Sequence, residues 1–526
     1  MFVQINSATL QGLEAMPVKV EVDAYSSGAV PRFIIVGLPD NAVKESQERI
    51  LAAIRLNGLR LSTKSVVINL APADLKKEGS GLDLPIAIGL LASTEALSFE
   101  EQLLAESMFI GELGLDGAVL PVKGALPISI KARKMGLKTL FVPKENEREA
   151  AVVDNLTVYG VSKLQEVIDF LLGNITLQPT IVNTREEFYN HQYTFDVDFE
   201  EVKGQENVKR AFEVAAAGGH NIILVGSPGC GKSMMAKRLP SILPPLSLHE
   251  SLETTQIHSI AGKLHKDVSL ISQRPFRAPH HTISDVGLVG GGQTFMPGEI
   301  CLAHNGVLFM DELPEFSRSV LETMRQPLED RVITISRSKY TFTLPCSFML
   351  VASMNPCPCG YHGDLSHQCV CTPGQIQRYM NKISGPLLDR IDIHCEIQAV
   401  PFAQLSQMQP GEPSEKIRDR VVQARNIQTE RFSFLPKQGG LGRVYCNAQM
   451  TERMLHEFAE PDAESLDMLR MAMERLKLSA RAYSRILKVA RTIADLAGSE
   501  KVESMHIAEA IGYRNLDRGD WAERGI

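Results

Sequence analysis

The chain has 526 residues, which is too long for one ordinary hydrophobic core and predicts two to four domains. Hydrophobic residues make up 44% and charged residues 22%, as in soluble globular proteins, and no apolar run reaches the roughly 18 residues of a membrane-spanning helix. The net charge of −7 argues against a protein that coats nucleic acid with its whole surface. Any nucleic-acid partner must therefore bind in a local groove or pore.

The segment 1–8 lacks a basic region followed by an apolar stretch, so we expect no signal peptide and a cytoplasmic protein without a membrane partner. Four of the nine cysteines fall between Cys357 and Cys371. In a cytosolic protein such clustering favours a metal site over disulfides.

Residues 1–172 predict a mixed α/β domain. Strand-like runs at 19–22, 32–36 and 65–69 alternate with helical patterns at 42–57, 84–93 and 125–134. Polar residues dominate 173–198, which we interpret as a linker. We expect a second α/β domain at 199–400 and a C-terminal domain of amphipathic helices at 401–526, above all at 465–497 and 504–513.

A phosphate-binding loop follows the strand expected at 221–225. The loop has the pattern GxxxxGK[ST] and consists of Gly226, Ser227, Pro228, Gly229, Cys230, Gly231, Lys232 and Ser233. Its glycines let backbone N–H groups point at phosphate oxygens, and the following helix adds its positive dipole end. Lys232 can reach the β- and γ-phosphates of ATP, and the Ser233 hydroxyl can ligate Mg²⁺.

Two carboxylates, Asp311 and Glu312, end the buried strand expected at 307–310. Adjacent carboxylates repel each other unless a cation or a catalytic role offsets the repulsion. Asp311 can hold Mg²⁺, and Glu312 can polarise the attacking water. Asn355 ends the strand expected at 348–354, where a neutral amide could orient water or contact the γ-phosphate. Alone it is a weak signal, because Asn-Pro is also a common turn.

These elements resemble the magnesium-chelatase-like branch of AAA+ proteins, and within it the ComM/YifB family. The matching stretches cover nearly the whole chain and lie at 202–205, 215–221, 274–281, 290–292, 325–329 and 355–360. The resemblance implies an α/β fold: an AAA+ P-loop core with a helical lid, preceded by a Lon-protease-like α+β domain of the ribosomal S5 type.

The resemblance also implies roles for three further residues. Asn355 resembles the family's first sensor, Arg390 the arginine finger inserted into a neighbouring subunit, and Arg481 the second sensor on the lid. An arginine at the γ-phosphate is worth roughly 10³ to 10⁵ in rate in related chemistry. The alternative is a surface ion pair, which we favour for Arg485. A finger supplied in trans requires a closed ring, and the family expectation is a homo-hexamer.

Two insertions are expected from the same resemblance. The segment 283–297, with three glycines, resembles a loop that breaks the second helix of the core. The segment 332–342 alternates like a hairpin that would face the pore of the ring. Arg337 and Lys339 lie near its turn and are our candidates for contacts with the DNA backbone. The alternative is an ordinary solvated turn.

Four cysteines, Cys357, Cys359, Cys369 and Cys371, form two C-x-C pairs within an insertion at 357–371. Four thiolates can close a tetrahedral Zn²⁺ site, although C-x₂-C is the commoner spacing. The histidines at 362 and 367 could replace one ligand, and the alternatives to zinc are reduced surface thiols or a redox pair.

The stretches 79–85 and 111–124 resemble the Lon-type proteolytic domain, which needs a serine nucleophile and a lysine base. The nucleophile loop reads Gly81-Leu-Asp83 here, and Leu126 stands where the lysine would fall. Ser80 and Lys123 are near, but neither is at the expected step. We predict a catalytically silent module, as in RadA-type recombination proteins, that binds DNA or packs a second ring tier.

The leading functional hypothesis is an ATP- and Mg²⁺-dependent translocase that encircles single- and double-stranded DNA in a central pore. The resemblance implies branch migration of recombination intermediates, on bare or recombinase-coated DNA, during natural transformation. Two other functions stay open. One is the motor of a chelatase that inserts Mg²⁺ into a porphyrin, and the other is an ATP-dependent protease.

Overall fold

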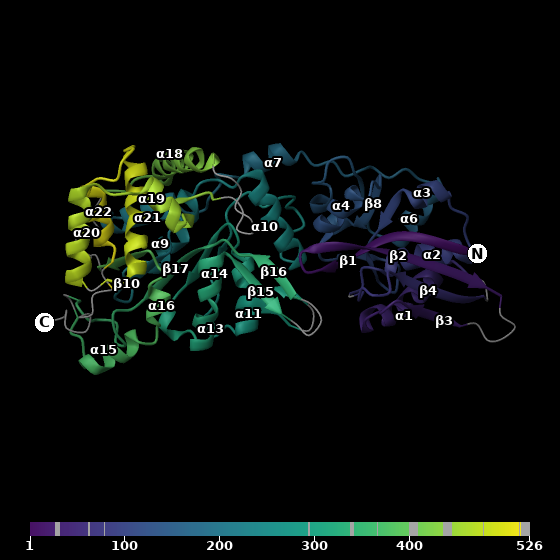
Figure 1. Cartoon of the computed structure of the whole chain (residues 1–526). Helices are drawn as coiled ribbons and strands as arrows, with labels where there is room; N and C mark the ends of the chain where they lie inside the picture. Colours follow the sequence, from purple (N-terminus) through teal and green to yellow (C-terminus); the bar gives the residue numbers. More distant parts are fainter. Residues whose placement is uncertain are drawn as a thin grey trace. The chain divides into compact units, whose positions relative to one another are not determined.

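The computed structural model describes residues 1–26, 32–61, 64–77, 79–292, 295–336, 341–364, 367–398, 409–434, 444–476, 478–514 and 516 (Figure 1). The chain forms two compact units. The first consists of 1–191, 247–272 and 292–297, and the second of 192–246, 273–291 and 298–526. Among the described residues no helix combines the length and hydropathy needed to cross a membrane.

The first unit is built on a seven-stranded mixed sheet with the strand order β3-β4-β2-β1-β5-β8-β9. Its strands are β1 (Phe2–Gln11), β2 (Glu14–Tyr25), β3 (Phe33–Val36), β4 (Ser65–Ala71), β5 (Ser107–Phe109), β8 (Thr139–Pro143) and β9 (Thr157–Val161). The short strands β6 (Glu112–Leu113) and β7 (Val119–Leu120) pair separately. Its helices are α1 (Asn41–Leu56), α2 (Asp83–Ser93), α3 (Glu101–Ala105), α4 (Ala125–Lys134), α5 (Glu147–Ala150), α6 (Leu164–Leu171), α7 (Thr184–Asn190) and α10 (Leu248–Ile260).

Helix α2 is buried on all sides within the first unit. All eleven of its residues are buried, which fits its continuous apolar sequence. A Cβ at Gly89 would lie 2.7 Å from Val22 Cγ2 on β2, so this glycine permits close packing of the helix on the sheet. Asp83 at the start of the helix is paired with Arg49, 2.9 Å away, because a buried carboxylate needs a partner.

The second unit contains a five-stranded parallel sheet with the order β11-β14-β17-β10-β18. Its strands are β11 (Phe276–Arg277), β14 (Val307–Met310), β17 (Met349–Met354), β10 (Ile222–Gly226) and β18 (Ile393–Ile397). The three central strands, β14, β17 and β10, are apolar except for Ser353, as expected when helices cover both faces of a parallel sheet. Because parallel strands all end at one edge, this topology brings the predicted nucleotide-binding residues together.

The helices of the second unit fall into a group beside the sheet and a C-terminal group. The helices that alternate with the strands along the chain are α8 (Glu206–Gly218), α9 (Lys232–Arg238), α11 (Asp285–Val289), α12 (Glu299–Leu302), α13 (Arg318–Thr323), α14 (Arg325–Asp330), α15 (Pro373–Met380) and α16 (Gly385–Leu388). The C-terminal helices are α18 (Ser414–Ser433), α19 (Glu452–Phe458), α20 (Ala463–Leu476), α21 (Ala480–Leu496) and α22 (Ser504–Gly512). One continuous apolar core joins α8 and the sheet to α18 and α21.

Three predicted segments gain detail from the structure. The expected linker contains helix α7. The expected insertion at 283–297 contains α11, β12 (Gly290–Gly291) and β13 (Met296–Pro297). The predicted hairpin is confirmed, because β15 (Val332–Ser336) pairs antiparallel with β16 (Thr341–Pro345). Arg337 and Lys339 lie outside the described residues, so their contact with DNA stays a prediction.

Candidate nucleotide site

The phosphate-binding loop connects the end of β10 to the start of α9. A Cβ at Gly226 would lie 2.4 Å from the carbonyl oxygen of Ile397, so only glycine fits where the loop leaves the sheet. Gly229 and Gly231 adopt positive φ angles of 80° and 96°, which turn the backbone into the helix. Lys232 Nζ donates to the carbonyl oxygens of Gly226, at 2.6 Å, and Ser227, at 3.0 Å. The ammonium thus lies within the loop that would surround the phosphates.

The side chains that could hold Mg²⁺ meet beside this loop. Ser233 Oγ donates to Asp311 Oδ2 at 2.8 Å, which joins the start of α9 to the end of β14. Ser353 Oγ on β17 donates to the other carboxylate oxygen, Oδ1. A hydroxyl and a carboxylate are oxygen ligands of the kind that Mg²⁺ prefers. The structure therefore brings together the two predicted Mg²⁺ ligands, and Ser353 orients one of them.

Glu312 is held by its backbone rather than by its side chain. It has a φ of 55°, in the left-handed region, and its N–H donates to Ser353 Oγ at 3.2 Å. Its side chain is 56% exposed, and its carboxylate oxygen Oε2 lies 3.8 Å from His281 Nδ1. The carboxylate therefore remains accessible to water, as a residue that polarises water must be.

Asn355 completes this edge of the sheet, because its Oδ1 accepts a hydrogen bond from Lys232 Nζ at 3.2 Å. A cavity of about 430 Å³ opens beside Asn355 and Glu312. Arg378, Tyr379 and Lys382, from α15 and the residues after it, also line it. The space next to the P-loop is thus large enough for water and for a side chain from outside the chain.

The predicted arginine finger lies at the other end of the same sheet. Arg390 precedes β18 and is only 6% exposed. Its Nη1 donates to the carbonyl oxygen of Pro386 at 2.6 Å, and its Nη2 pairs with Glu329 Oε2 at 2.5 Å. Strand β18 runs parallel to β10, which ends at the P-loop. A five-residue strand spans about 16 Å, so Arg390 cannot reach the P-loop of its own chain.

Arg481 belongs to the same group of charges. The hydrogen bond from Arg390 lowers the pKa of the Glu329 carboxyl, and the positive charges of Arg481 and Arg485 lower it further. Arg485 pairs with the buried Asp392 at 3.0 Å, so it is in an ion pair as predicted, but the pair is largely buried and not on the surface as expected. Arg481 itself is exposed, at the start of α21. The two predicted catalytic arginines therefore lie together, away from the phosphate-binding loop.

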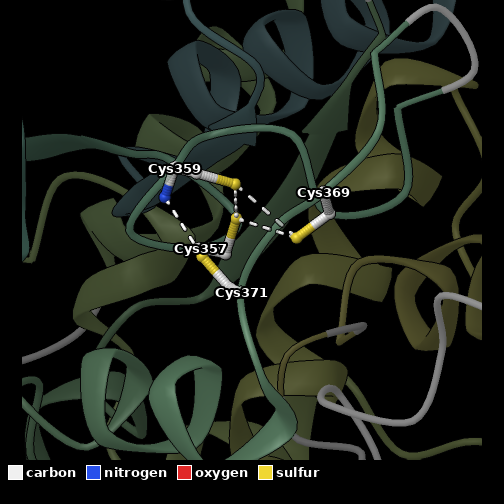
Figure 2. A group of neighbouring side chains, drawn as sticks. All are labelled: Cys357, Cys359, Cys369 and Cys371. Carbon is white, nitrogen blue, oxygen red and sulfur yellow. Dashed lines mark hydrogen bonds between the residues drawn. The ribbon is translucent and has the colours of Figure 1, made fainter.

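Four cysteine side chains converge on one another, as Figure 2 shows. The sulfur of Cys357 lies 3.3 Å from that of Cys359 and 3.7 Å from that of Cys369. Cys359 N donates to the sulfur of Cys371 at 3.4 Å. A tetrahedral zinc site with Zn–S bonds of 2.3 Å has sulfurs about 3.8 Å apart, and the four sulfurs, all within 4.8 Å of one another, fit such a site after small shifts.

The backbone favours the thiolate at Cys359 only, because burial and the neighbouring thiols raise the pKa of the Cys369 and Cys371 thiols. Burial raises the pKa of the Cys359 thiol, but hydrogen bonds from the backbone of Tyr361 and Val370 and from Cys357 outweigh it and lower the pKa to about 6. Among the described residues, the candidate metal ligands in this group are these four cysteines, without a histidine.

The cysteine loop is built onto the P-loop. Ser227 Oγ donates to Asp364 Oδ2 at 2.6 Å. A Cβ added at Gly360 would lie 2.7 Å from Pro228 Cδ, so the two loops touch at this point. The cluster therefore fixes a loop that contacts the phosphate-binding residues directly.

Sequence reasoning missed several residues of this site: Ser353, Asp364, His281 and Glu329. Ser353 carries the clearest signal, because a serine in an otherwise apolar buried strand, two residues before Asn355, has to find a partner. The other three act through contacts between distant segments, for which the sequence gives no spacing rule.

Three family models match the chain. The model described as "Magnesium chelatase, subunit ChlI" matches residues 198–405. The model "Subunit ChlI of Mg-chelatase" matches residues 20–146, and "Magnesium chelatase, subunit ChlI C-terminal" matches residues 411–514. The matches extend over the first unit, the P-loop sheet and the C-terminal helices.

Two relatives align over nearly their whole length. "Competence protein ComM" of Haemophilus influenzae is 40% identical over 515 residues, which are 98% of this chain and 97% of the relative. "Uncharacterized protein YifB" of Escherichia coli is 41% identical over 518 residues, with the same coverage.

Two further proteins match over shorter stretches. "Lon protease 2" of Bacillus subtilis is 26% identical over 132 residues, 25% of this chain and 23% of the protease. "DNA repair protein RadA" of Haemophilus influenzae is 31% identical over 160 residues, 30% of this chain and 32% of that protein. With the parallel P-loop sheet, these matches confirm the predicted fold class, including the Lon-like similarity of the N-terminal region.

Proposed function

Because the chain belongs to the ComM/YifB family of magnesium-chelatase-like AAA+ ATPases, we propose that it works as a ring that hydrolyses ATP to move DNA. One observation carries the proposal. Lys232 and Glu312 lie at one end of the parallel sheet, whereas Arg390 and Arg481 lie at the other. Two half-sites that cannot meet within one chain become complete only between neighbouring subunits.

The P-loop end supplies the hydrolytic half. Its backbone and Lys232 hold the β- and γ-phosphates, and Ser233 and Asp311 hold Mg²⁺. When bound, the ion neutralises charge that develops between these phosphates. Glu312 polarises the attacking water, and Asn355, already bonded to Lys232, orients that water or contacts the γ-phosphate.

The opposite end supplies the second half to the next subunit. Arg390 leaves Glu329 and enters the neighbour's cavity beside Glu312 and Asn355, where it stabilises the leaving phosphate. Arg481 serves the same neighbouring site from the lid. A head-to-tail contact of this kind closes into a ring, and we propose a homo-hexamer.

DNA is the proposed substrate of the motor. The name of one full-length relative refers to competence, and that of a partial relative to DNA repair. A net charge of −7 fits a protein that holds DNA only within a pore, where phosphates are gripped with little sequence preference. We propose branch migration of recombination intermediates during natural transformation, with Arg337 and Lys339 touching the DNA backbone.

A branch-migration assay with three DNA strands tests this function. Wild-type protein should move the branch point, and both Lys232→Ala and Glu312→Gln should abolish movement. Glu312→Gln keeps every phosphate-binding group, so it should still bind ATP and remain trapped as a ring on DNA. Movement that persists in both variants would refute the motor.

Activity assays of the wild-type protein with different partners separate the translocase from the two other functions. A chelatase motor would raise its ATPase rate with a porphyrin-binding partner rather than with forked DNA. A protease would digest casein in an ATP-dependent manner. An ATPase rate that rises only with DNA supports the translocase.

The four cysteines are proposed to bind one Zn²⁺ per chain, which would hold the loop of Gly360 and Asp364 in place against the P-loop. Metal analysis of protein purified without chelator should give about one zinc per chain. The zinc should be lost in Cys357→Ser and retained in Cys446→Ser, whose thiol is buried outside the cluster. Zinc-free wild-type protein would rule out this site.

A further inference from the structure

The first unit contains a cavity of about 330 Å³ that takes no part in the nucleotide site. It is lined by the end of β1, by the loop at 79–82 that precedes α2, and by the segment 121–123. Its volume is at the low end of the range for pockets that hold small ligands, and most of its wall is apolar.

The cavity follows the edge of a strand. Ala8, Thr9 and Leu10 are consecutive residues of β1, and all three line it. Successive side chains of a strand point to opposite faces, so a cavity that touches three in a row must lie along the strand's edge. On one edge β1 pairs with β2 over its whole length. On the other, the described pairing with β5 is limited to Asn6 and Met108. The cavity therefore lies where a continuation of β5 would run.

A buried polar group marks the same wall. Thr9 is 4% exposed, and its Oγ1 has no hydrogen-bond partner in the described part of the chain. Burying a hydroxyl without a partner is costly, and folded proteins rarely retain such a group without a reason. A rotation of the Thr9 side chain would bring this hydroxyl into the cavity that the residue lines, where a hydrogen-bonding group of a ligand would satisfy it.

Two further residues with polar side chains line the cavity. Ser80 Oγ donates to the Glu112 carboxylate and keeps its lone pairs for a donor. Lys123 Nζ contacts the Met296 sulfur at 3.6 Å, and a thioether is a weak acceptor. The ammonium thus has donors to spare for a carbonyl or carboxylate oxygen.

We propose that this cavity binds an extended segment of another polypeptide, which adds to the sheet as a strand beside β1. A peptide backbone offers alternating N–H and C=O groups, which are the complement of an open strand edge. A carbonyl oxygen of the segment accepts from Thr9 or Lys123, and its side chains fill the apolar wall. The Ser80 hydroxyl is committed to Glu112, so the site binds the segment without cleaving it.

A cavity-filling variant of the full-length protein provides the test. A Cβ at Gly81 would meet Val122 Cγ1 at 3.5 Å, an ordinary contact, and both residues line the cavity. Gly81→Leu should therefore fold and fill the site. The probe is a pool of random hexapeptides with blocked ends, from which bound peptides are recovered and identified by mass spectrometry. Wild-type protein should enrich a subset at least tenfold over Gly81→Leu.

Matched variants and a modified peptide identify the mode of binding. An enriched peptide should bind Lys123→Met at least fivefold more weakly, and should bind Lys134→Met, which changes an exposed lysine on α4, like wild type. N-methylation of alternate backbone amides, which blocks strand pairing, should abolish binding. Thr9→Val should weaken binding while its melting temperature stays at or above that of wild type, because the unpaired hydroxyl is gone.

Two outcomes would overturn the proposal. Equal enrichment by wild type and Gly81→Leu would place peptide binding elsewhere. Binding that survives N-methylation but requires an acidic side chain would make Lys123 a simple charge site rather than part of a strand-binding edge.

Discussion

The two ends of the parallel sheet in the second unit differ in how their charges are held. At the carboxyl end, Glu312 is 56% exposed and Lys232 is bonded mainly to carbonyl oxygens of its own loop. At the amino end, Arg390 is 6% exposed and Asp392 is 1% exposed, and both are in ion pairs. The carboxyl end is thus open to a ligand, whereas the charges of the amino end are paired within the chain.

At the amino end, the contacts of Asp392 and those of Arg390 differ in how readily they can be exchanged for a ligand. Asp392 accepts from Arg485 and from the backbone of Asn221, and it lies 3.5 Å from His220. These contacts stabilise the amino end whether or not a neighbour is present. Arg390 is different, because its carboxylate partner, Glu329, is half exposed and can be exchanged for a phosphate. The sheet thus joins a reactive end to a stable one.

Mixing two inactive variants tests most directly whether the two ends of the sheet complete one site between subunits. Arg390→Ala should lower the ATPase rate by about 10³- to 10⁵-fold, and Lys232→Ala should abolish it. An equal mixture should recover activity, because a subunit with an intact P-loop can sit beside one with an intact arginine. In random rings about one quarter of the interfaces have both. ATPase rates over a range of mixing ratios measure the recovery.

A mixture as inactive as its components would contradict a shared site. Arg470→Ala is the matched control, because this arginine is in an exposed ion pair on α20. Mixed with Lys232→Ala, it should give the activity expected from simple dilution of wild type.

Asp392→Asn should have the next largest effect, on stability. It leaves the half-buried Arg485 without its carboxylate, which should lower the free energy of unfolding by about 3–5 kcal/mol. Urea unfolding of the second unit measures this, with Asp467→Asn, in an exposed ion pair, as the control that should change little.

The pH dependence of the same pair has a definite sign. Burial raises the pKa of Asp392, but Arg485, His220 and the Asn221 N–H outweigh it and hold that pKa well below its usual range. Such a group stabilises the folded state above the pKa of the unfolded chain, about 4, and that stabilisation is lost as the pH falls. Wild type should therefore lose stability below about pH 4 more steeply than Asp392→Asn. Parallel curves would show that the carboxylate is not held in this way.

The contrast also explains what the sequence could predict. The P-loop, Asp311, Glu312 and Asn355 each follow a predicted strand directly, and parallel strands place such residues at one edge. Their grouping in space was therefore within reach of the sequence. The predicted Ser233 and Asp311 do meet, 78 residues apart, for this reason.

The amino end was not predictable in the same way. Glu329, Arg390 and Arg485 come from α14, the segment before β18 and α21, and their meeting depends on how helices pack. Helical periodicity gives the buried face of each helix but not its neighbour. The open edge of β1 was missed for a related reason, since strand pairing in a mixed sheet is set by tertiary contacts.

A smaller effect on stability is expected from Lys488, close to Arg485 and Asp392 at the amino end of the sheet. It lies on α21, its Nζ donates to the carbonyl oxygen of Ala448 at 3.2 Å, and burial together with the nearby Arg485 lowers its pKa to about 8. Between pH 8 and about 10.5 the unfolded chain binds more protons than the folded one, so stability should rise with pH in this window. The rise should be at most roughly 3–4 kcal/mol, because the two pKa values differ by about 2.5 and each pH unit contributes about 1.4 kcal/mol.

Comparing variants isolates this contribution from other groups that titrate at high pH. The stability of wild type relative to Lys488→Met should increase from pH 7.5 to pH 10.5. The same comparison with Lys501→Met, an exposed lysine, should stay flat. A flat Lys488 curve would mean that the ammonium is fully hydrated in the folded protein.

The smallest effect is expected at the reactive end, from Gly360→Ala. The added Cβ would lie 2.7 Å from Pro228 Cδ, and a proline ring in the P-loop cannot rotate away, so one of the two loops must shift. We expect the KM for ATP to rise about tenfold, equivalent to about 1.4 kcal/mol, with little loss of kcat. Gly363→Ala is the matched control, because Gly363 also has a left-handed φ, 77° against 88°, but a Cβ there would meet nothing within 4 Å. Equal effects of the two substitutions would assign the change to backbone strain in the cysteine loop. A larger effect at Gly360 would show that the loop acts on ATP binding through its contact with Pro228.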